Sequence, residues 1–515
     1  MHARNKKYYN CKKSEDRELI RNLSFTMHKN DKYAIIGIEG SGKSSLIKSI
    51  YGTELEYIEL AGSINYKKLK IGYLPQSIRD TFENENVLDF ILKDNLNSVI
   101  ESDDYRMLGS LDRILKKVKF NTDQFDESKT MNMFSGGEVV KLGLAKVLLR
   151  EPDILLLDEP TNDLDLETVL FIEDFIINEE RPILYISHDE RLLENTANGI
   201  IHLTQINKNQ KAMTFFEKSG YIEYKQKRNL SMDSQEMVAR KQRSDYKKKV
   251  ERFRQIYQKV EHQQNQAVRN PSLARLLAKK MKSMKSMEKR MGKEETSFLD
   301  IPERADEINL FFDKDISIPN KKVILDYNNE SICIDDKVLA TNINLTVKGP
   351  QKLCIIGENG TGKSTLLRKI VTDLSNVVNI NVGYMPQNYD ELIQGENTLD
   401  FIMRGRVSSE EGRVRKMLGA LHFTREEMLY STESLSGGQK AKLILLKIVL
   451  DKSDVLILDE PTRNLSPLSI PVIHNILMLF KGTIISVSHD RSFIENVFDD
   501  VLELRKNGLF KARRL

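Results

Sequence analysis

Short apolar runs alternate with stretches of helical period at both ends of this chain. The runs YAII, ILLL and ILYIS, at residues 33–36, 154–157 and 183–187, predict buried parallel strands. The stretches between them repeat apolar residues every three or four positions and therefore predict helices. Strands that alternate with helices indicate an α/β fold at each end of the chain.

The middle of the chain has a different pattern, with two apolar seams of heptad period. The first seam is Tyr246, Val250, Phe253, Tyr257 and Val260, and the second is Leu273, Leu277, Met284, Met287 and Met291, interrupted by Lys280. Two such seams joined by a polar turn predict an antiparallel helical hairpin. Asn270 and Pro271 suit a helix cap and first turn, which places the turn at His262–Asn270. The first helix, Met232–Glu261, is then about 45 Å long. The methionines are interpreted as seam residues rather than a cofactor site.

The two ends of the chain are versions of each other. YAIIGIEGSGKSSLIKSI and LCIIGENGTGKSTLLRKI form one matched pair, and five further matched blocks follow in the same order. Six matched blocks indicate a duplicated domain. We expect a first domain at residues 1–224, a hairpin linker at 225–295, and a second domain at 296–515 that includes a short lead-in, 296–320.

The first matched block has the spacing G-x-x-x-x-G-K-[ST] between a strand and a helix. Such a loop surrounds phosphates with backbone N–H groups, and the helix N-terminus adds partial positive charge. Lys43 and Lys363 are expected to reach the β- and γ-phosphates of a nucleotide, and Ser44 and Ser364 to hold Mg²⁺. The full predicted loops are Gly37, Ile38, Glu39, Gly40, Ser41, Gly42, Lys43, Ser44 and Ser45, and Gly357, Glu358, Asn359, Gly360, Thr361, Gly362, Lys363, Ser364 and Thr365.

Each half also contains an apolar strand that ends in Asp-Glu, at Asp158-Glu159 and Asp459-Glu460. The aspartate is expected to orient the metal, and the glutamate to polarise the water that attacks the γ-phosphate. Acids in this place can also simply cap a following helix. Two phosphate loops in the same chain favour the catalytic interpretation.

The SGG blocks make both halves resemble ATP-binding cassette domains. The resemblance implies that Ser135, Gly136 and Gly137, and Ser436, Gly437 and Gly438, are signature residues that contact the γ-phosphate of ATP held by the opposite half. It also implies that Gln76 and Gln387 lie near the metal and the attacking water. His188 and His489 match the histidine that senses the γ-phosphate. Both composite sites then have the residues needed for ATP hydrolysis.

Three positions depart from the cassette pattern. The D-loop, which follows the Asp-Glu pair, has the family's aspartate in the first half as Asp165. The second half has Ser466 at that position, which puts communication between the two nucleotide sites in doubt. Tyr8 or Tyr9 is the candidate to stack on adenine in the first half, and the segment Cys333–Asp336 has no aromatic residue for this role. The segment NCKKSED interrupts the expected first strand.

Two cassettes separated by a long charged linker resemble the ABC-F family. The segment FFEKSGYIEYKQKR, at residues 215–228, is similar to the segment that leads from the first cassette into the linker in that family. The resemblance implies binding at the ribosome's tRNA exit site, with the linker reaching toward the P-site tRNA and the peptidyl-transferase centre. Some members regulate translation, and others dislodge antibiotics from the ribosome. The segment between Gln76 and Ser135 is only slightly longer than that between Gln387 and Ser436. Many members of the family that act as translation factors insert an arm in this segment of the first cassette, and here it is small or absent. This favours the resistance role, but a housekeeping role in translation stays open.

Composition and charge agree with this interpretation. The chain is 40% apolar and 30% charged, with a net charge of +4 and three widely spaced cysteines, so we expect no disulfide framework and no zinc site. Without a long apolar stretch it is expected to be soluble and cytoplasmic, with no membrane domain. From Lys225 to Lys293, 21 Lys and Arg face 6 Asp and Glu, a local charge of +15. This segment is either a solvated helix face or a surface for a polyanion.

Few aromatic residues accompany these basic residues, which favours backbone contact with ribosomal RNA and tRNA over a specific DNA site. We therefore expect the ribosome as partner, no DNA, and a monomer whose two cassettes pair within one chain. Two alternatives are the ATPase subunit of a membrane transporter and a DNA-linked coiled-coil ATPase. The first does not need a basic hairpin, and in the second the coiled coil interrupts a single cassette.

Overall fold

The computed structural model describes residues 2–4, 8–12, 15–53, 58–60, 63–65, 69–93, 100, 107–126, 129–162, 164–206, 211–266, 271–295, 298, 318–319, 321–334, 337–377, 380–393, 395–421, 423–463 and 465–512. Two compact units share the chain. One comprises Met1–Tyr221 with Ala305–Leu515, and the other is Ile222–Arg304. The first unit contains both predicted cassettes. The domain boundaries predicted above stay a prediction.

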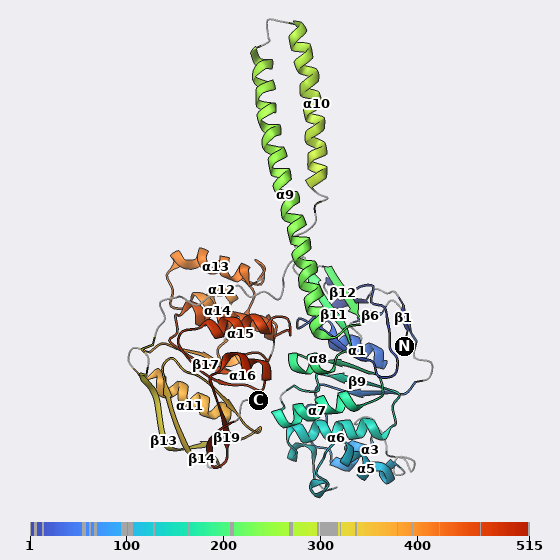
Figure 1. Ribbon diagram of the computed structural model, residues 1–515, viewed down its shortest axis with the longest axis vertical. Helices are drawn as coiled ribbons and strands as arrows, with labels where there is room; N and C mark the ends of the chain where they lie inside the picture. The colour runs from blue at the N-terminus through green and yellow to red at the C-terminus, as the bar shows by residue number, and fades with distance from the viewer. Residues whose placement is uncertain are drawn as a thin grey trace. The chain divides into compact units, whose positions relative to one another are not determined.

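A six-stranded sheet forms the centre of the first cassette (Figure 1). In spatial order its strands are β12 (Lys211–Glu217), β11 (Gly199–Ile206), β5 (Lys32–Gly37), β10 (Ile183–Ile186), β9 (Ile154–Asp158) and β8 (Ile71–Leu74). All neighbours are parallel except β11 and β12. The three predicted strands are β5, β9 and β10, and every residue in them is buried. Their prediction as buried parallel strands is confirmed.

Two small antiparallel sheets lie at the start of the chain. They contain β1 (His2–Arg4), β4 (Phe25–Thr26) and β7 (Ser63–Asn65), and β2 (Tyr8–Lys12), β3 (Glu15–Ile20) and β6 (Ile58–Leu60). The helices of this cassette are α1 (Lys43–Tyr51), α2 (Arg79–Phe82), α3 (Val87–Leu92), α5 (Leu111–Lys117), α6 (Gly136–Leu149), α7 (Leu166–Asn178) and α8 (Glu190–Thr196). The segment NCKKSED thus falls where β2 ends and β3 begins.

The second cassette repeats the central sheet. Its strands, in spatial order, are β16 (Val382–Met385), β17 (Val455–Asp459), β18 (Thr483–Val487), β15 (Lys352–Ile356), β19 (Asp500–Arg505) and β20 (Gly508–Lys511). β13 (Val323–Ile334) and β14 (Lys337–Lys348) form a separate antiparallel ribbon. The helices are α11 (Lys363–Ser375), α12 (Thr398–Met403), α13 (Glu411–Ala420), α14 (Gly437–Leu450), α15 (Ile470–Leu479) and α16 (Arg491–Val497).

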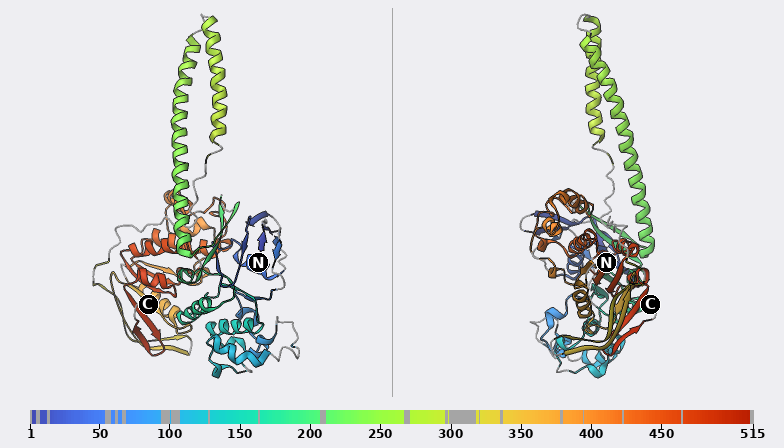
Figure 2. Two further views of the ribbon diagram at one scale, coloured as in Figure 1. Left: turned by 45° about the vertical axis from the view of Figure 1, so that its right-hand side comes forward. Right: turned by 90° about the vertical axis from the view of Figure 1, so that its left-hand side faces the viewer.

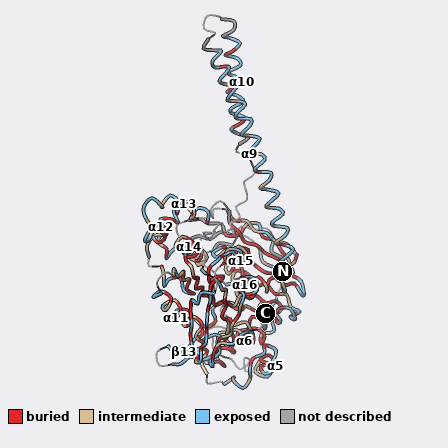
Figure 3. Tube along the Cα trace, turned by 60° about the vertical axis from the view of Figure 1, so that its left-hand side comes forward, coloured by how far each residue is buried: buried red, intermediate tan, exposed pale blue. Residues whose placement is uncertain are grey.

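Strand β17 shows why the central strands are apolar at every position. Val455 and Ile457 belong to one hydrophobic cluster, whereas Leu456 and Leu458 belong to another. Successive side chains of a strand point to opposite faces, so both faces of this sheet are covered. Figure 3 shows the buried residues concentrated in the cassettes, with the long helices mostly exposed. The core holds the strand ends, where the acidic pairs lie, in fixed positions.

The second unit consists mainly of α9 (Tyr221–Gln266), whose first residue is the last of the first unit's N-terminal segment, and α10 (Pro271–Glu295). At 46 residues, α9 is about 69 Å long. Its predicted bounds were wrong: it begins before Met232 and ends after Glu261. No glycine or proline follows Gly220 until Pro271, so nothing in the sequence stops the helix earlier. The prediction of a turn at His262–Asn270 was therefore wrong for residues 262–266, which are helical, and residues 267–270 lie outside the described residues.

The views in Figures 1 and 2 agree that α9 and α10 run side by side. Val260 of α9 packs with Leu277 and Met284 of α10, and the Tyr246 hydroxyl donates a hydrogen bond to the Met291 carbonyl oxygen at 3.3 Å. These five residues belong to the predicted seams.

The seam of α10 differs from its prediction at one position. Met281 packs against the buried cluster, whereas the predicted seam residue Met287 is 55% exposed. Lys280 is exposed, so the seam passes beside it rather than through it. The head group of Lys280 stays in water, so the neighbouring apolar residue, Met281, takes its place in the seam.

Every Lys and Arg side chain of α10 from Arg275 to Arg290 is exposed. The chain therefore presents a basic surface along this helix while its apolar seam is covered. Among the residues that the structure describes, no helix has the length and apolar character needed to cross a bilayer.

Candidate nucleotide-binding sites

Each phosphate loop joins a central strand to a helix through glycines with positive φ. Gly40 and Gly42 have φ of 74° and 92°, and Gly360 and Gly362 repeat them at 81° and 92°. A side chain is strained in this region, so these turns need glycine. Lys43 Nζ donates to the carbonyl oxygens of Gly37 and Ile38 at 3.0 and 3.1 Å. Lys363 repeats this with Gly357 and Glu358 at 2.7 and 2.8 Å.

The lysines of both loops are buried, which favours an anionic ligand. Burial lowers the pKa of Lys43, while the charges of Glu159, Glu39 and Asp158 oppose this change. Burial likewise lowers the pKa of Lys363. A buried ammonium group is stable only with anions close by. The phosphates of a nucleotide would supply those anions.

The predicted metal ligands come together at the end of each acidic strand. The Ser44 hydroxyl donates to Asp158 Oδ1 at 3.0 Å, and Tyr73 donates to Asp158 Oδ2 at 3.4 Å. Burial raises the pKa of Asp158, and the hydrogen bond from Ser44 opposes this. The pKa of Asp459 is shifted in the same way: burial raises it, and a hydrogen bond from Ser364 opposes this rise. Carboxylate and hydroxyl oxygens are ligands that Mg²⁺ prefers, so both pairs fit the predicted ion.

The two glutamates have the same strained backbone but different partners. Glu159 and Glu460 both have φ of 51°, which is uncommon for a residue with a side chain. Gln76 Nε2 donates to Glu159 Oε2 at 2.8 Å, and His188 Nε2 lies 3.3 Å from Glu159 Oε1. Glu460 instead accepts from the backbone N–H of His489 at 3.3 Å, with the His489 ring 3.6 Å away.

The pKa values of these groups diverge accordingly. Burial alone would raise the pKa of Glu159, but His188, Lys43 and Arg463 bring it below its usual value. Burial, with the charge of Asp459, raises the pKa of Glu460 to about 8. Burial and the charge of Lys363 lower the pKa of His489 to about 4. The first site therefore favours an ionised glutamate, and the second a neutral one.

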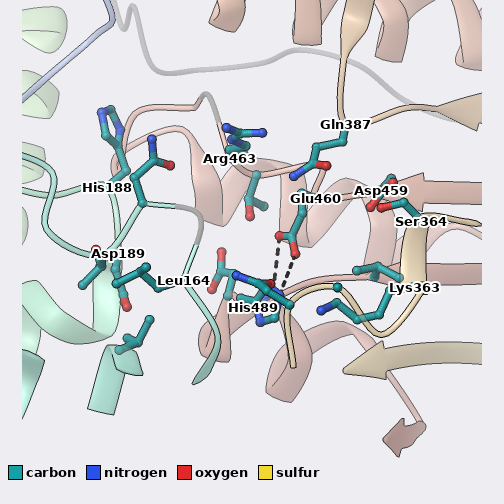
Figure 4. Close-up of a pocket in the computed structure, with 18 of the residues that line it drawn as sticks. Leu164, His188, Asp189, Lys363, Ser364, Gln387, Asp459, Glu460, Arg463 and His489 are labelled. Atoms are coloured by element: carbon teal, nitrogen blue, oxygen red, sulfur yellow. Dashed lines mark hydrogen bonds and ion pairs between the residues drawn. The ribbon is translucent and has the colours of Figure 1, made fainter. Parts of the chain in front are cut away.

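A cavity of about 520 Å³ is lined by both cassettes (Figure 4). Lys363, Ser364, Gln387, Asp459 and Glu460 come from the second cassette, and Leu164, His188 and Asp189 come from the first. Ile334 and Leu339 give it aliphatic walls, in keeping with the absence of an aromatic residue near Cys333. The structure thus brings these residues of the second site together, whereas Ser135, Gly136 and Gly137, the signature predicted for this site, are not among the residues that line the cavity. The side chains of Tyr8 and Tyr9 lie outside the described residues.

The signature serines begin helices. Ser135 caps α6 with Glu138 as the reciprocal partner, and Ser436 caps α14 with Gln439. Gly438 N donates to Glu39 Oε2 at 2.9 Å, which joins the second signature to the first phosphate loop. Gly136 and Gly137 form the first turn of α6, where a Cβ on Gly137 would lie 2.3 Å from Thr168 Oγ1.

Several contacts between the cassettes have no counterpart among the predictions from the sequence. His188 Nδ1 lies 2.8 Å from the Leu465 carbonyl oxygen, and Tyr221 donates to the Pro467 carbonyl oxygen at 3.3 Å. Arg491 Nη2 lies 2.5 Å from Glu173 Oε2 and 3.5 Å from Asp189 Oδ2. A difference between matched blocks is the only signal in the sequence: Arg491 and Glu173 stand where the other half has Glu190 and His474.

Comparison with known proteins agrees with this geometry. A family model described as "ABC transporter" matches residues 20–162 and 340–463, together just over half of the chain. "ABC transporter F family member 2" of Arabidopsis thaliana is 27% identical, over 95% of this chain and 75% of its own. "Ribosome protection protein VmlR" of Bacillus subtilis (strain 168) is 26% identical, over 96% and 86%.

A solved structure shares the fold. Archaeal ribosome recycling factor aABCE1, in its complex with ribosomal stalk protein aP1, superposes with a TM-score of 0.58 at 16% identity. The match covers 96% of this chain and 88% of that one. With two phosphate loops, two signatures and relatives of this kind matched over most of their length, the chain belongs to the ABC transporter family of ATP-binding cassettes, as a tandem member of its ABC-F branch.

Proposed function

We propose that this protein hydrolyses ATP to ADP and phosphate at two sites, each built from both cassettes. Lys43 and Lys363 bind the β- and γ-phosphates, and the opposite signature contacts the γ-phosphate. Glu159, and Glu460 in its ionised form, accept a proton from the attacking water, which Gln76 and Gln387 help to orient. Ser44 with Asp158, and Ser364 with Asp459, would hold Mg²⁺, which would neutralise phosphate charge when bound. The hydrogen bond between Glu39 and Gly438 supports shared sites, because it joins the two cassettes at a phosphate loop.

We further propose that the protein binds the ribosome when ATP is bound, with α9 and α10 directed toward the P-site tRNA and the peptidyl-transferase centre. The observation that carries this proposal is the surface of α10, whose basic side chains from Arg275 to Arg290 are all exposed. Such a surface suits RNA phosphates. The ribosome-protecting relative supports protection against antibiotics as the output, with a housekeeping role in translation as the alternative.

The decisive experiment traps the ATP-bound state. In the double variant Glu159→Gln and Glu460→Gln, ATP binds but is not cleaved, because both proton acceptors are lost. The variant should co-sediment with ribosomes in ATP and stay free in ADP. A double variant that binds ATP yet sediments apart from ribosomes would contradict the ribosome proposal. Migration with membranes would instead support the transporter alternative.

The basic surface is tested by salt. Each phosphate contact adds about 0.7–0.9 to the slope of log K against log salt, so Lys279, Lys280, Lys282 and Lys285 replaced by Gln should flatten the slope by about 3. A matched control replaces the exposed Lys321, Lys322, Lys348 and Lys481 of the second cassette. Equal slopes in the two variants would show that α10 faces solvent on the ribosome.

A further inference from the structure

One contact at the first site brings a negative charge to the place where a phosphate is expected. Glu39 lies in the first phosphate loop, between β5 and α1, and its Oε2 accepts the backbone N–H of Gly438 at 2.9 Å. Gly438 is the second residue of α14, in the second cassette. The acceptor therefore comes from one cassette and the donor from the other.

The N–H of Gly438 is a natural site for an anion. The first N–H groups of a helix have no partner within the helix and carry partial positive charge. Ser436 serves one of them, since its side chain accepts from Gln439 N at 3.3 Å, and its carbonyl oxygen accepts the first hydrogen bond within the helix, from Lys440 N at 2.9 Å. Glu39 accepts from Gly438, which lies between Ser436 and these two donors in sequence. A carboxylate oxygen here makes the same kind of hydrogen bond as a phosphate oxygen.

The same carboxylate also acts on the lysine of its own loop. Glu159, Glu39 and Asp158 are the carboxylates whose charges act on buried Lys43. Glu159 and Asp158 belong to the hydrolytic machinery, whereas Glu39 has no role in the proposed reaction. Lys43 and Gly438 are the groups from the two cassettes that the terminal phosphate of ATP would contact, and Glu39 interacts with both.

The second site differs at this position. Asn359 stands in the second loop where Glu39 stands in the first, and it lines the cavity shared by both cassettes. An amide carries no net charge, so it cannot replace a phosphate on a helix N-terminus in the way that a carboxylate does. The two loops are otherwise alike in their glycine turns and lysine contacts.

We propose that Glu39 is an internal stand-in for the terminal phosphate of ATP at the first site. Its carboxylate holds the signature of the second cassette on the first phosphate loop, and it leaves Gly438 when the γ-phosphate arrives. ADP has no γ-phosphate and does not displace it. The first site thus discriminates between ATP and ADP less strongly than a site with a neutral residue. This inference rests on the proposed function, in which ATP binds at both sites.

The test measures nucleotide affinity at one site at a time. Lys363→Ala confines binding to the first site, and Glu39→Gln is then added to it. ATP should bind about three- to tenfold more tightly than in the parent, while the Kd for ADP changes by about twofold at most. Glu39→Asp, which keeps the charge but shortens the side chain, should also tighten ATP binding because it loses Gly438. The matched control, Asn359→Glu with Lys43→Ala, should weaken ATP binding at the second site by a similar factor.

Three results would overturn the inference. ATP affinity that is unchanged in Glu39→Gln would show that the contact does not compete with nucleotide. Equal gains for ATP and ADP would show general charge repulsion at the loop. Weaker ATP binding would make Glu39 a ligand of the nucleotide. If the Lys363→Ala parent binds no ATP at all, the proposed function of the first site fails as well, which separates the two failures.

Discussion

The two nucleotide sites have matching loops, yet the surroundings of their glutamates differ. At the first site Glu159 accepts a hydrogen bond from Gln76, faces His188, and has a pKa below its usual value. At the second site burial brings the pKa of Glu460 to about 8, and that of His489 to about 4. The residues that each cassette supplies to its own site are nearly the same. Burial and the contacts of Gln76 and His188 account for part of the difference, and the opposite cassette supplies another part.

The loops that follow the acidic pairs supply the part that comes from the opposite cassette. Arg463 of the second cassette acts on Glu159, whereas the matching residue of the first cassette is the neutral Asn162. Asp165 of the first cassette acts on Lys363 and His489, whereas the second cassette has Ser466 there. The first site thus receives a cation from its partner and the second site an anion. After duplication, a pair of sites can diverge through the loops that they exchange.

The largest expected effect separates the two glutamates. Glu159→Gln should reduce steady-state ATP hydrolysis about a hundredfold, because the better-oriented proton acceptor is lost. Glu460→Gln should reduce the rate less than about tenfold, because Glu460, with a pKa of about 8, is mostly protonated at pH 7 and is a poor proton acceptor there. Phosphate release at saturating ATP measures both rates. Equal losses in the two variants would mean that the sites are equivalent, or that neither turns over without the other.

The motifs of these sites were predictable from sequence, because loop spacing and strand-end acids depend on local structure. The burial of β5, β9 and β10 was predictable for the same reason: an apolar run with no polar position has no face for water. Contacts between the cassettes were not predictable. The hydrogen bond between Glu39 and Gly438 joins residues 399 positions apart, and no local pattern marks it.

The seam of α10 failed for a different reason. Met284, Met287 and Met291 fit one heptad register, and Met281, Met284 and Met291 fit another, so sequence alone does not choose between them. Packing against Val260 and its neighbours selects the register with Met281. The predicted α9 was too short because its first turns consist mostly of polar residues. Helix propensity without an apolar stripe is only a weak indication of a helix.

A second comparison between the cassettes concerns stability. In the first, buried Glu179 accepts hydrogen bonds from Arg181 and Lys117 at 2.7 and 3.0 Å, and Lys32 Nζ donates to the carbonyl oxygen of Arg181 at 2.7 Å. The second has Phe480 in the place of Glu179. Glu179→Gln should therefore destabilise the first cassette by about 3 kcal/mol and leave the second unchanged. Hydrogen exchange of the amides in β5 and β10, against those in β15 and β18, measures the difference.

Acid should reveal the same contrast. Burial alone would raise the pKa of Glu179, but its hydrogen bonds to Arg181 and Lys117 lower it from 4.5 to about 2. This carboxylate therefore stabilises the folded state above pH 4.5, by about 3 kcal/mol, and loses that contribution as the pH falls toward 2. The first cassette should lose protection before the second, and Glu179→Gln should remove this pH dependence. Glu180→Gln is the matched control, since Glu180 is 73% exposed. A similar loss in both variants would point to net charge as the cause.

The smallest expected effect tests the exchanged loops themselves. Arg463 lines the cavity with Glu159 and His188, and it lies two residues before Leu465, whose carbonyl oxygen is 2.8 Å from His188 Nδ1. A cation in this place favours the ionised form of Glu159 and stabilises the negative charge of the phosphates. With Glu460→Gln present, so that only the first site turns over, Arg463→Asn should lower kcat about tenfold, and Arg463→Lys about threefold.

The reciprocal substitution tests the second site. Asn162→Arg places the cation at the second site, and with Glu159→Gln present it should raise the kcat of that site by up to about tenfold. A gain at one site and a loss at the other cannot come from general destabilisation, which would lower both rates. If Arg463→Asn lowers turnover equally in the two single-site backgrounds, Arg463 acts on the closing of the cassettes, and the asymmetry of the sites has its origin in the pairs Asp165 with Ser466 and Glu39 with Asn359.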